Sequence, residues 1–435
     1  MPLSGLSVGA CRRPGGRVGD PVSGSVSQKL YIYGVDHPDK CLPPVLVCPL
    51  DWGLGHATRC VPLIRIFLDR GMKVVVAAGG DALEFLRKAF PSGGPPSSPA
   101  VRFLSLPGKA VRYPGGGGSL SMTWSLMRQL PGLLYSVRSE HRRLQDLVRE
   151  TGAGWVVSDN RYGLFTKRVP CVFMGHQLNL RPPRGMAWAG GLMNRVNHWL
   201  IGRFSACWVP DFPGTCNLSG TLSHGGRLAG RVRYLGPLSR FRDLAVQPTD
   251  NPLPEDFPPD FLLLLLSGPE PQRSLFEQLL VEQLAGLSFS AVMVRGLVGS
   301  GAGQDRSYMP DHLPGNCRLA VFDHLPDRPL AWLLKESGVV VCRPGYSSLM
   351  DLSVFGKKAL LVPTPGQTEQ EYLGQRLQAA GLAACLSQEG LPLESGVDKA
   401  RSGSGIPRME VSDDLLHAAV DELLEMGGQA GAGGQ

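Results

Sequence analysis

Glycine-rich and polar segments follow each strand that the sequence predicts in the second half of the chain. These strands are expected over residues 262–266, 291–295, 318–322, 339–342 and 359–362. The residues after them that could contact a ligand are Ser267, Gly268, Arg295, His324, Leu325, Gly345, Tyr346, Ser347, Ser348, Gln367, Gln370 and Glu371. Each segment alone is equally typical of an ordinary turn. In a parallel sheet, however, all five segments meet at the carboxyl edge, so together they predict a nucleotide-binding crevice.

The segment after the fourth of these strands is the most specific. Gly345 permits close approach of a ligand to the backbone, and Ser347 or Ser348 can cap a helix expected over residues 347–354. The first turn of that helix offers free N–H groups and the positive end of its dipole to a diphosphate. Asp351 follows about one turn later, where its carboxylate can accept both hydroxyls of a ribose. A capped helix with an exposed acid remains the alternative.

In the first half of the chain, the segment Asp51-Trp52-Gly53-Leu54-Gly55-His56 joins a predicted strand to a predicted helix. Gly53 and Gly55 allow a phosphate or a sugar to approach the backbone. The turn lacks the dinucleotide fingerprint, because Thr58 stands where a third glycine is needed. A histidine at a helix N-terminus has its cationic form disfavoured, so we predict that His56 is neutral and can take a proton. Asp51 is the second catalytic candidate, and a locally capping His56 is the alternative.

Two further polar turns of the first half are predicted to face the same cleft from its acceptor side, where a second substrate would bind. Asp159, Asn160 and Arg161 follow a strand expected over residues 155–158, and His176 follows another over residues 170–174. A purely structural role for both turns stays open.

A basic and aromatic segment spans residues 181–204. It combines tryptophans with arginines, a composition typical of a helix that lies on an anionic membrane and equally of a core helix with a solvated face. We therefore expect a cytoplasmic protein, with peripheral contact to the inner face of the membrane as one of the two interpretations.

The elements that must position these residues form two α/β blocks. The first block begins with a strand over residues 45–50, a helix over 57–70 and a strand over 72–78, which is the βαβ pattern of a parallel sheet. We expect two doubly wound, Rossmann-like domains that face each other across a cleft. The predicted division is a disordered extension (1–43), an N-terminal acceptor-side domain (44–245), a linker (246–260), a C-terminal nucleotide-binding domain (261–425) and a disordered tail (426–435).

Composition agrees with this organisation and excludes other classes. Hydrophobic residues make up 43% of the 435 residues, enough for two cores. The 44 Lys and Arg exceed the 37 Asp and Glu by only seven, which argues against a dedicated nucleic-acid binder. The 10 cysteines form no CxxC pair, so neither a disulfide framework nor a zinc site is expected. No apolar run approaches the roughly 20 residues of a membrane helix.

These motifs resemble those of the family-28 glycosyltransferases of the two-Rossmann (GT-B) type, which include the bacterial peptidoglycan N-acetylglucosaminyltransferase and plant galactolipid synthases. The likeness covers about residues 44–420 and is strongest over 261–379. It places the family's ribose-binding acid on Asp351, its sugar-binding pair on Gln370 and Glu371, and its cleft histidine on His56. The segments 51–56, 158–163 and 236–240 are closer to an uncharacterised bacterial branch.

The resemblance implies transfer of a hexose or N-acetylhexosamine from a nucleotide sugar, with UDP as the expected nucleotide, to an unknown acceptor that is lipid-linked or part of the cell envelope. Inversion at the anomeric carbon is expected. No Asp-x-Asp motif is present, so neither an essential metal nor another cofactor is expected. A non-hydrolysing nucleotide-sugar epimerase and a non-catalytic nucleotide-sugar-binding module remain as alternatives, and the oligomeric state is open.

Overall fold

The computed structural model describes residues 42–91, 101–108, 119–182, 185–226, 228–244, 250–287, 290–297, 318–409 and 413–432. The expected N-terminal extension lies outside these ranges except for residues 42 and 43. The first residues of the expected linker (246–249) and the last three of the expected tail (433–435) also lie outside them.

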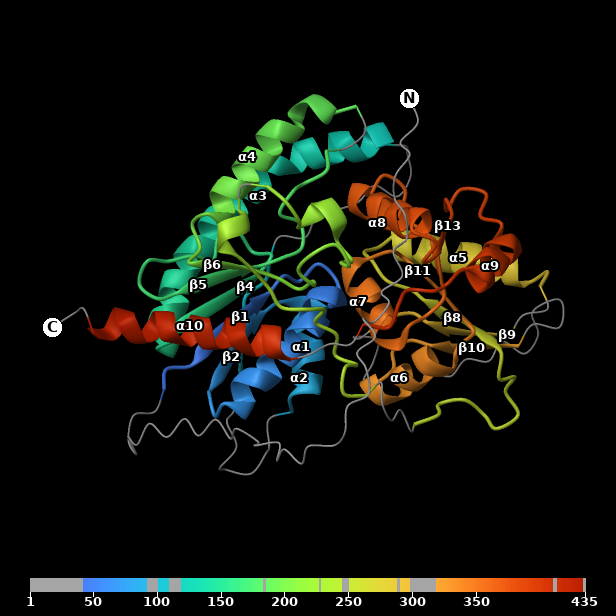
Figure 1. Cartoon of the computed structure of the whole chain (residues 1–435), viewed down its shortest axis with the longest axis horizontal. Helices are drawn as coiled ribbons and strands as arrows, with labels where there is room; N and C mark the ends of the chain where they lie inside the picture. Colours follow the sequence, from blue (N-terminus) through green and yellow to red (C-terminus); the bar gives the residue numbers. More distant parts are fainter. Residues whose placement is uncertain are drawn as a thin grey trace, which may run out of the picture. The chain divides into compact units, whose positions relative to one another are not determined.

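Two parallel sheets, each with helices packed on both faces, make up the described chain (Figure 1). The strands of the first sheet are β1 (Val45–Pro49), β2 (Val74–Ala78), β3 (Val101–Ser105), β4 (Trp155–Asp159), β5 (Cys171–Met174), β6 (Ala206–Val209) and β7 (Val232–Tyr234). Those of the second are β8 (Phe261–Leu265), β9 (Ser290–Val294), β10 (Leu319–Phe322), β11 (Val339–Cys342), β12 (Ala359–Leu361) and β13 (Ala384–Cys385). The predicted fold class is therefore confirmed.

Helices connect many of the successive strands and complete the two Rossmann-like halves. They are α1 (Leu54–Asp69), α2 (Gly80–Ala89), α3 (Ser119–Thr151), α4 (Gly190–Ile201), α5 (Gln272–Leu284), α6 (Asp327–Glu336), α7 (Tyr346–Phe355), α8 (Thr368–Ala379), α9 (Leu393–Ser402) and α10 (Asp414–Ala432). Single-turn 3-10 helices occur at Ala187–Ala189, Gly220–Leu222 and Ala229–Arg231.

The strand order fixes where a ligand can bind. The first sheet has the order β3-β2-β1-β4-β5-β6-β7, and the second has the order β10-β9-β8-β11-β12-β13. The order reverses between β1 and β4 in one sheet and between β8 and β11 in the other. Ligands of open parallel sheets bind at such switch points, beyond the carboxyl ends of the strands. A ligand is therefore expected at the turns that leave β1, β4, β8 and β11.

Burial on both faces explains why the central strands are continuous apolar runs. In β1, Val47 packs in the same cluster as Phe67 of α1, whereas Leu46 packs with Leu147 of α3 on the other face. In β8, Leu263 and Leu264 likewise belong to clusters on opposite faces. Strands covered on both faces need no polar positions, which is typical of parallel sheets.

The C-terminal helix α10 packs on β4 and β7 of the first sheet, although it follows the second sheet in the chain. Leu416, Val420 and Leu423 are buried there, and Gly427 lies against the Trp155 ring, where a Cβ atom would come within 2.4 Å of Nε1. The helix continues to Ala432, so the chain is helical beyond residue 426, where the sequence predicted a disordered tail. In the described ranges, no helix is both long enough and apolar enough to cross a bilayer.

Candidate active site

His56 lies in the first turn of α1, at the switch point of the first sheet. The helix begins after Gly53, whose φ of 82° suits glycine and turns the chain from β1 into α1. The Nδ1 atom of His56 is 3.1 Å from Oδ2 of Asp159, the last residue of β4, and the side chain of Asp159 is fully buried. The two strands that flank the switch point thus bring an imidazole and a carboxylate together.

Arg59 lies one turn along α1 and completes this group. Its guanidinium is buried and donates to both carboxylate oxygens of Asp159, with Nε 2.9 Å from Oδ2. Its Nη2 is also 2.9 Å from Nδ1 of His56, and its Nη1 is 3.3 Å from Nδ1 of His176. One buried arginine therefore contacts the carboxylate at the end of β4, the histidine after β5 and the histidine at the start of α1.

The charges of this group keep His56 neutral. Burial and the neighbouring Arg59 lower its pKa below the ordinary value, and Asp159 opposes them only in part. Burial alone would raise the pKa of Asp159, but Arg59 and His56 outweigh it and hold that pKa below its ordinary value. The neutral state agrees with the sequence prediction, although the main causes are burial and Arg59 rather than the helix dipole.

The contacts of His56 permit two arrangements of its proton. With the proton on Nδ1, the ring donates to Asp159 and leaves Nε2 as an acceptor. With the proton on Nε2, Nδ1 accepts from Arg59, which can only donate. The first form can take a proton from a substrate hydroxyl, and the second can donate a hydrogen bond to a phosphate.

His176 connects this group to the second sheet. Its Nε2 is 2.5 Å from Oε1 of Glu369, in the first turn of α8, and its ring stacks on Tyr346 with 4.0 Å between ring centres. Gln177 donates to the other oxygen of Glu369. Burial would raise the pKa of Glu369, but His176 in particular lowers it below its ordinary value. The expected acceptor-side His176 is thus held between Arg59 and Glu369.

The start of α7 lies against the start of α1. Ser347 donates to the backbone oxygen of Gly55 at 2.9 Å, and a Cβ atom on Gly55 would lie 2.8 Å from the Ser347 hydroxyl. Tyr346 is buried and donates to the oxygen of Pro210 at 2.8 Å. Gly345 precedes the helix in an extended conformation, and neither Ser347 nor Ser348 caps it. The carboxyl edges of the two sheets therefore meet at these helix N-termini.

Asp351 lies further along α7 and faces the segment after β7. Its carboxylate accepts a hydrogen bond of 2.6 Å from Ser239, and Arg240 next to it pairs with Asp327. Burial raises the pKa of Asp351 to about 6, against the effect of Arg240. The negative charge of Asp351, the residue predicted to bind the ribose, is therefore only partly stabilised by its neighbours in this structure.

Side chains at the start of α8 accept hydrogen bonds from backbone N–H groups of the turn that leads into this helix. Gln367 caps the helix by accepting from the backbone N–H of Gln370, whose side chain accepts from that of Thr364 at 2.8 Å. Glu371 accepts from the N–H of Gly366 at 3.1 Å. The expected sugar-binding pair, Gln370 and Glu371, is thus folded back onto its loop, whereas Glu369 reaches the other sheet.

Several residues expected at the site lie elsewhere in the structure. Asp51 accepts a hydrogen bond from the N–H of Gly108, after β3. It does not belong to the group formed by His56, Arg59, Asp159 and His176. Arg161 is buried and pairs with Glu140 of α3 at 2.9 Å, so it supports the fold rather than an acceptor. Asn160 adopts a left-handed φ of 57° in the turn between Asp159 and Arg161.

The remaining expected donor residues surround the carboxyl edge of the second sheet. Arg295 pairs with Glu277 at 2.6 Å and with Asp323 at 3.1 Å, so its charge is already compensated. Ser267 and Gly268 form an exposed loop after β8. His324 makes an edge contact with Phe85 of α2, with 6.5 Å between ring centres, and Leu325 is buried.

Sequence reasoning missed Arg59, Glu369 and the pairing of His56 with Asp159. Arg59 follows His56 by three residues, so the two share one helix face. This spacing was the one feature of the sequence from which their contact could have been predicted. The other contacts join segments about 100 or more residues apart, and no local pattern encodes them.

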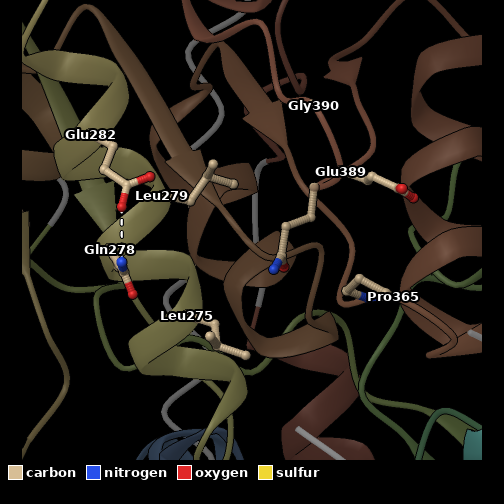
Figure 2. Close-up of a pocket in the computed structure, with 8 residues that line it drawn as sticks. Leu275, Gln278, Leu279, Glu282, Pro365, Glu389 and Gly390 are labelled. Carbon is tan, nitrogen blue, oxygen red and sulfur yellow. Dashed lines mark hydrogen bonds between the residues drawn. The ribbon is translucent and has the colours of Figure 1, made fainter. Parts of the chain in front are cut away.

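A cavity of about 600 Å³ opens between α5 and the segment after β13. Figure 2 shows Leu275, Gln278, Leu279 and Glu282 on α5, opposite Pro365 and Glu389. None of the residues predicted for the site lines this cavity. In the part of the chain that the structure describes, no group of three or more His, Cys, Asp or Glu side chains could hold a metal ion.

Comparisons with known proteins agree with this architecture. Residues 300–412 match the glycosyltransferase family 28 C-terminal domain. An uncharacterized glycosyltransferase of Methanosarcina acetivorans is 24% identical over 347 residues, which cover 77% of this chain and 81% of the relative. The UDP-N-acetylglucosamine–N-acetylmuramyl-(pentapeptide) pyrophosphoryl-undecaprenol N-acetylglucosamine transferase of a Methylobacterium species is 26% identical over 337 residues, covering 76% and 80%. The sequence suggested an uncharacterised bacterial branch, whereas this uncharacterized relative is archaeal.

Solved structures show the same fold at low sequence identity. The glycotransferase of kitacinnamycin has a TM-score of 0.53 at 16% identity and covers 90% of this chain and 97% of its own. MurG of Acinetobacter baumannii has a TM-score of 0.50 at 15% identity, with 88% and 100% covered. Together these findings show a glycosyltransferase whose residues 300–412 match the family 28 C-terminal domain and whose two parallel sheets have the GT-B fold.

Proposed function

We propose that the chain transfers a hexose or N-acetylhexosamine from a UDP-sugar to a hydroxyl of a lipid-linked or cell-envelope acceptor, with inversion, and without a metal. The observation that carries this proposal is the 2.9 Å hydrogen bond from Ser347 to Gly55. It places the N-terminus of α7, which suits a diphosphate, next to the turn that holds His56. The likeness to the Methylobacterium transferase, which is named for a UDP-N-acetylglucosamine donor and an undecaprenol-linked acceptor, supports both the UDP-sugar donor and a lipid-linked acceptor.

In this proposal the second sheet holds the donor. Backbone N–H groups at the start of α7 bind the diphosphate and stabilise the charge that develops on it as the sugar leaves. Asp351 accepts the ribose hydroxyls in place of its bond from Ser239. Gln370 and Glu371 contact the sugar.

His56 deprotonates the acceptor. The acceptor oxygen forms a bond to the anomeric carbon while the bond from that carbon to the diphosphate breaks, and Nε2 of His56 takes the hydroxyl proton. Asp159 accepts from Nδ1, fixes the tautomer that leaves Nε2 able to accept, and stabilises the imidazolium that forms. Arg59 keeps Asp159 ionised.

A transfer assay with a panel of UDP-sugars and membrane lipid extracts tests this function. We expect His56→Ala to transfer sugar at least about a hundredfold more slowly than the parent, within the usual range for a general base. His417→Ala, on the exposed face of α10, is the matched control and should leave the rate unchanged. His56→Gln distinguishes the two proton arrangements, because glutamine can donate to a phosphate but cannot take the proton.

Three results would contradict the proposal. Near-parental turnover by His56→Ala would remove the base. Conversion of the nucleotide sugar without any acceptor would indicate an epimerase, and nucleotide binding without turnover on any acceptor would indicate a binding module.

A further inference from the structure

A stripe of large apolar side chains is exposed along α4 and the 3-10 turn before it. Trp188 is 80% exposed, Leu192 65%, Val196 45% and Trp199 58%. Their spacing of three and four residues puts them on one side of the helix. A contiguous apolar stripe of this kind marks an interaction surface rather than an ordinary solvated face. We call these four residues, with the exposed Arg195 between them, the α4 face.

The segment of the chain that carries the α4 face is basic. The 51 residues from 160 to 210 contain no Asp or Glu and seven Lys or Arg, of which only Arg161 is buried and paired with an acid outside the segment, Glu140, among the described side chains. Arg203 lies over the Trp199 ring at 3.8 Å and over the Phe165 ring at 5.2 Å. Phe165 in turn contacts His141 of α3, with 4.4 Å between ring centres.

The opposite side of α4 is fixed to the segment that follows His176. Asn197 donates to the backbone oxygens of Gln177 and Leu178 at 3.1 and 2.8 Å, and Asn194 exchanges two hydrogen bonds with Leu180. Whatever the α4 face binds is therefore held close to the turn that carries His176 and Gln177.

We propose that the α4 face docks on an anionic lipid bilayer. Tryptophan rings favour the boundary between headgroups and acyl chains, and arginines pair with lipid phosphates. A second copy of the chain fits less well, because a two-fold contact would set this basic surface against itself without an acidic partner. The docking deepens the lipid-linked part of the proposed function, but it does not depend on transferase activity.

Sedimentation with lipid vesicles tests the proposal on the full chain. We expect the parent to bind vesicles of phosphatidylcholine mixed with phosphatidylglycerol, to bind pure phosphatidylcholine far less, and to dissociate as salt is added. The double variant Trp188→Ser/Leu192→Ser should bind at least about tenfold more weakly. Leu275→Ser, an exposed leucine of α5, is the matched control and should bind like the parent.

A second pair of variants tests the charge. Arg195→Glu should weaken binding to the anionic vesicles, whereas Arg87→Glu, the same change on the exposed side of α2, should not. The proposal fails if the parent does not bind anionic vesicles, or if both α4 variants bind as the parent does. It also fails if the parent is dimeric in gel filtration and the double variant becomes monomeric without any loss of vesicle binding. Transfer activity on a water-soluble acceptor should survive in every variant, so loss of docking and loss of catalysis are distinguishable.

Discussion

The neighbours of His56 have opposite effects on its pKa. Arg59 and burial disfavour the imidazolium, and Asp159 favours it. A base that stays neutral through the physiological range needs no adjustment before it accepts a proton. Within the proposed mechanism, Asp159 acts through His56 and Arg59 acts through Asp159, so both are positioning residues.

Asp351 gives a prediction at the residue scale. Its pKa is raised on folding from 3.8 to about 6, so between these pH values the folded chain keeps a proton that the unfolded chain has lost. Stability therefore falls as the pH rises through this window, and the loss persists above it. Asp351→Asn should raise the unfolding midpoint at pH 8, by on the order of 2 kcal/mol in free energy, and much less at pH 4.5.

The same substitution should weaken donor binding, because the ionised carboxylate is the stronger acceptor for ribose hydroxyls. Thermal unfolding at the two pH values, with and without UDP, measures both effects. An equal stability gain at both pH values would show that the charge of Asp351 is not the cause.

At the scale of elements, the strands that are buried on both faces were the ones that the sequence predicted best. The runs that became β8 and β11 were placed to within one residue, because strands covered on both faces are continuous and apolar. The 33-residue helix α3 was missed, since Pro131 and Gly132 within its sequence are typical breakers. The half-buried β3 showed no clear pattern. The switch-point turns were predictable, but which side chains meet there depends on contacts between the sheets.

Helix α10 gives a prediction at the element scale. Leu423 is 1% exposed, whereas its neighbour Glu422 forms an ion pair with Arg233 in which both side chains are more than a third exposed. We expect Leu423→Ala to lower the free energy of unfolding by about 2–5 kcal/mol. Glu422→Ala should lower it by less than about 1 kcal/mol. Denaturant unfolding of the two variants measures the difference, and equal losses would mean that the buried face of α10 does not anchor the helix.

At the scale of the whole molecule, the described contacts join the two sheets at their carboxyl edges. The bond from Ser347 to Gly55, the pair of His176 with Glu369 and the bond from Ser239 to Asp351 all link residues of one half to the other. All three involve residues near the proposed donor site. Donor binding and the contact between the halves should therefore be coupled, since in the proposed function the ribose hydroxyls replace the bond from Ser239 to Asp351.

In the proposed function the second half binds the donor and the first half supplies the base His56. Calorimetric titration with UDP tests this assignment most directly. We predict that the parent binds UDP more tightly than ADP or GDP, and that His56→Ala binds UDP about as well as the parent. Asp351→Ala should lose about 2–4 kcal/mol, or roughly 30- to 700-fold in affinity, because a charged acceptor is lost. Equal binding of all three nucleotides, or unchanged UDP affinity in Asp351→Ala, would contradict the account.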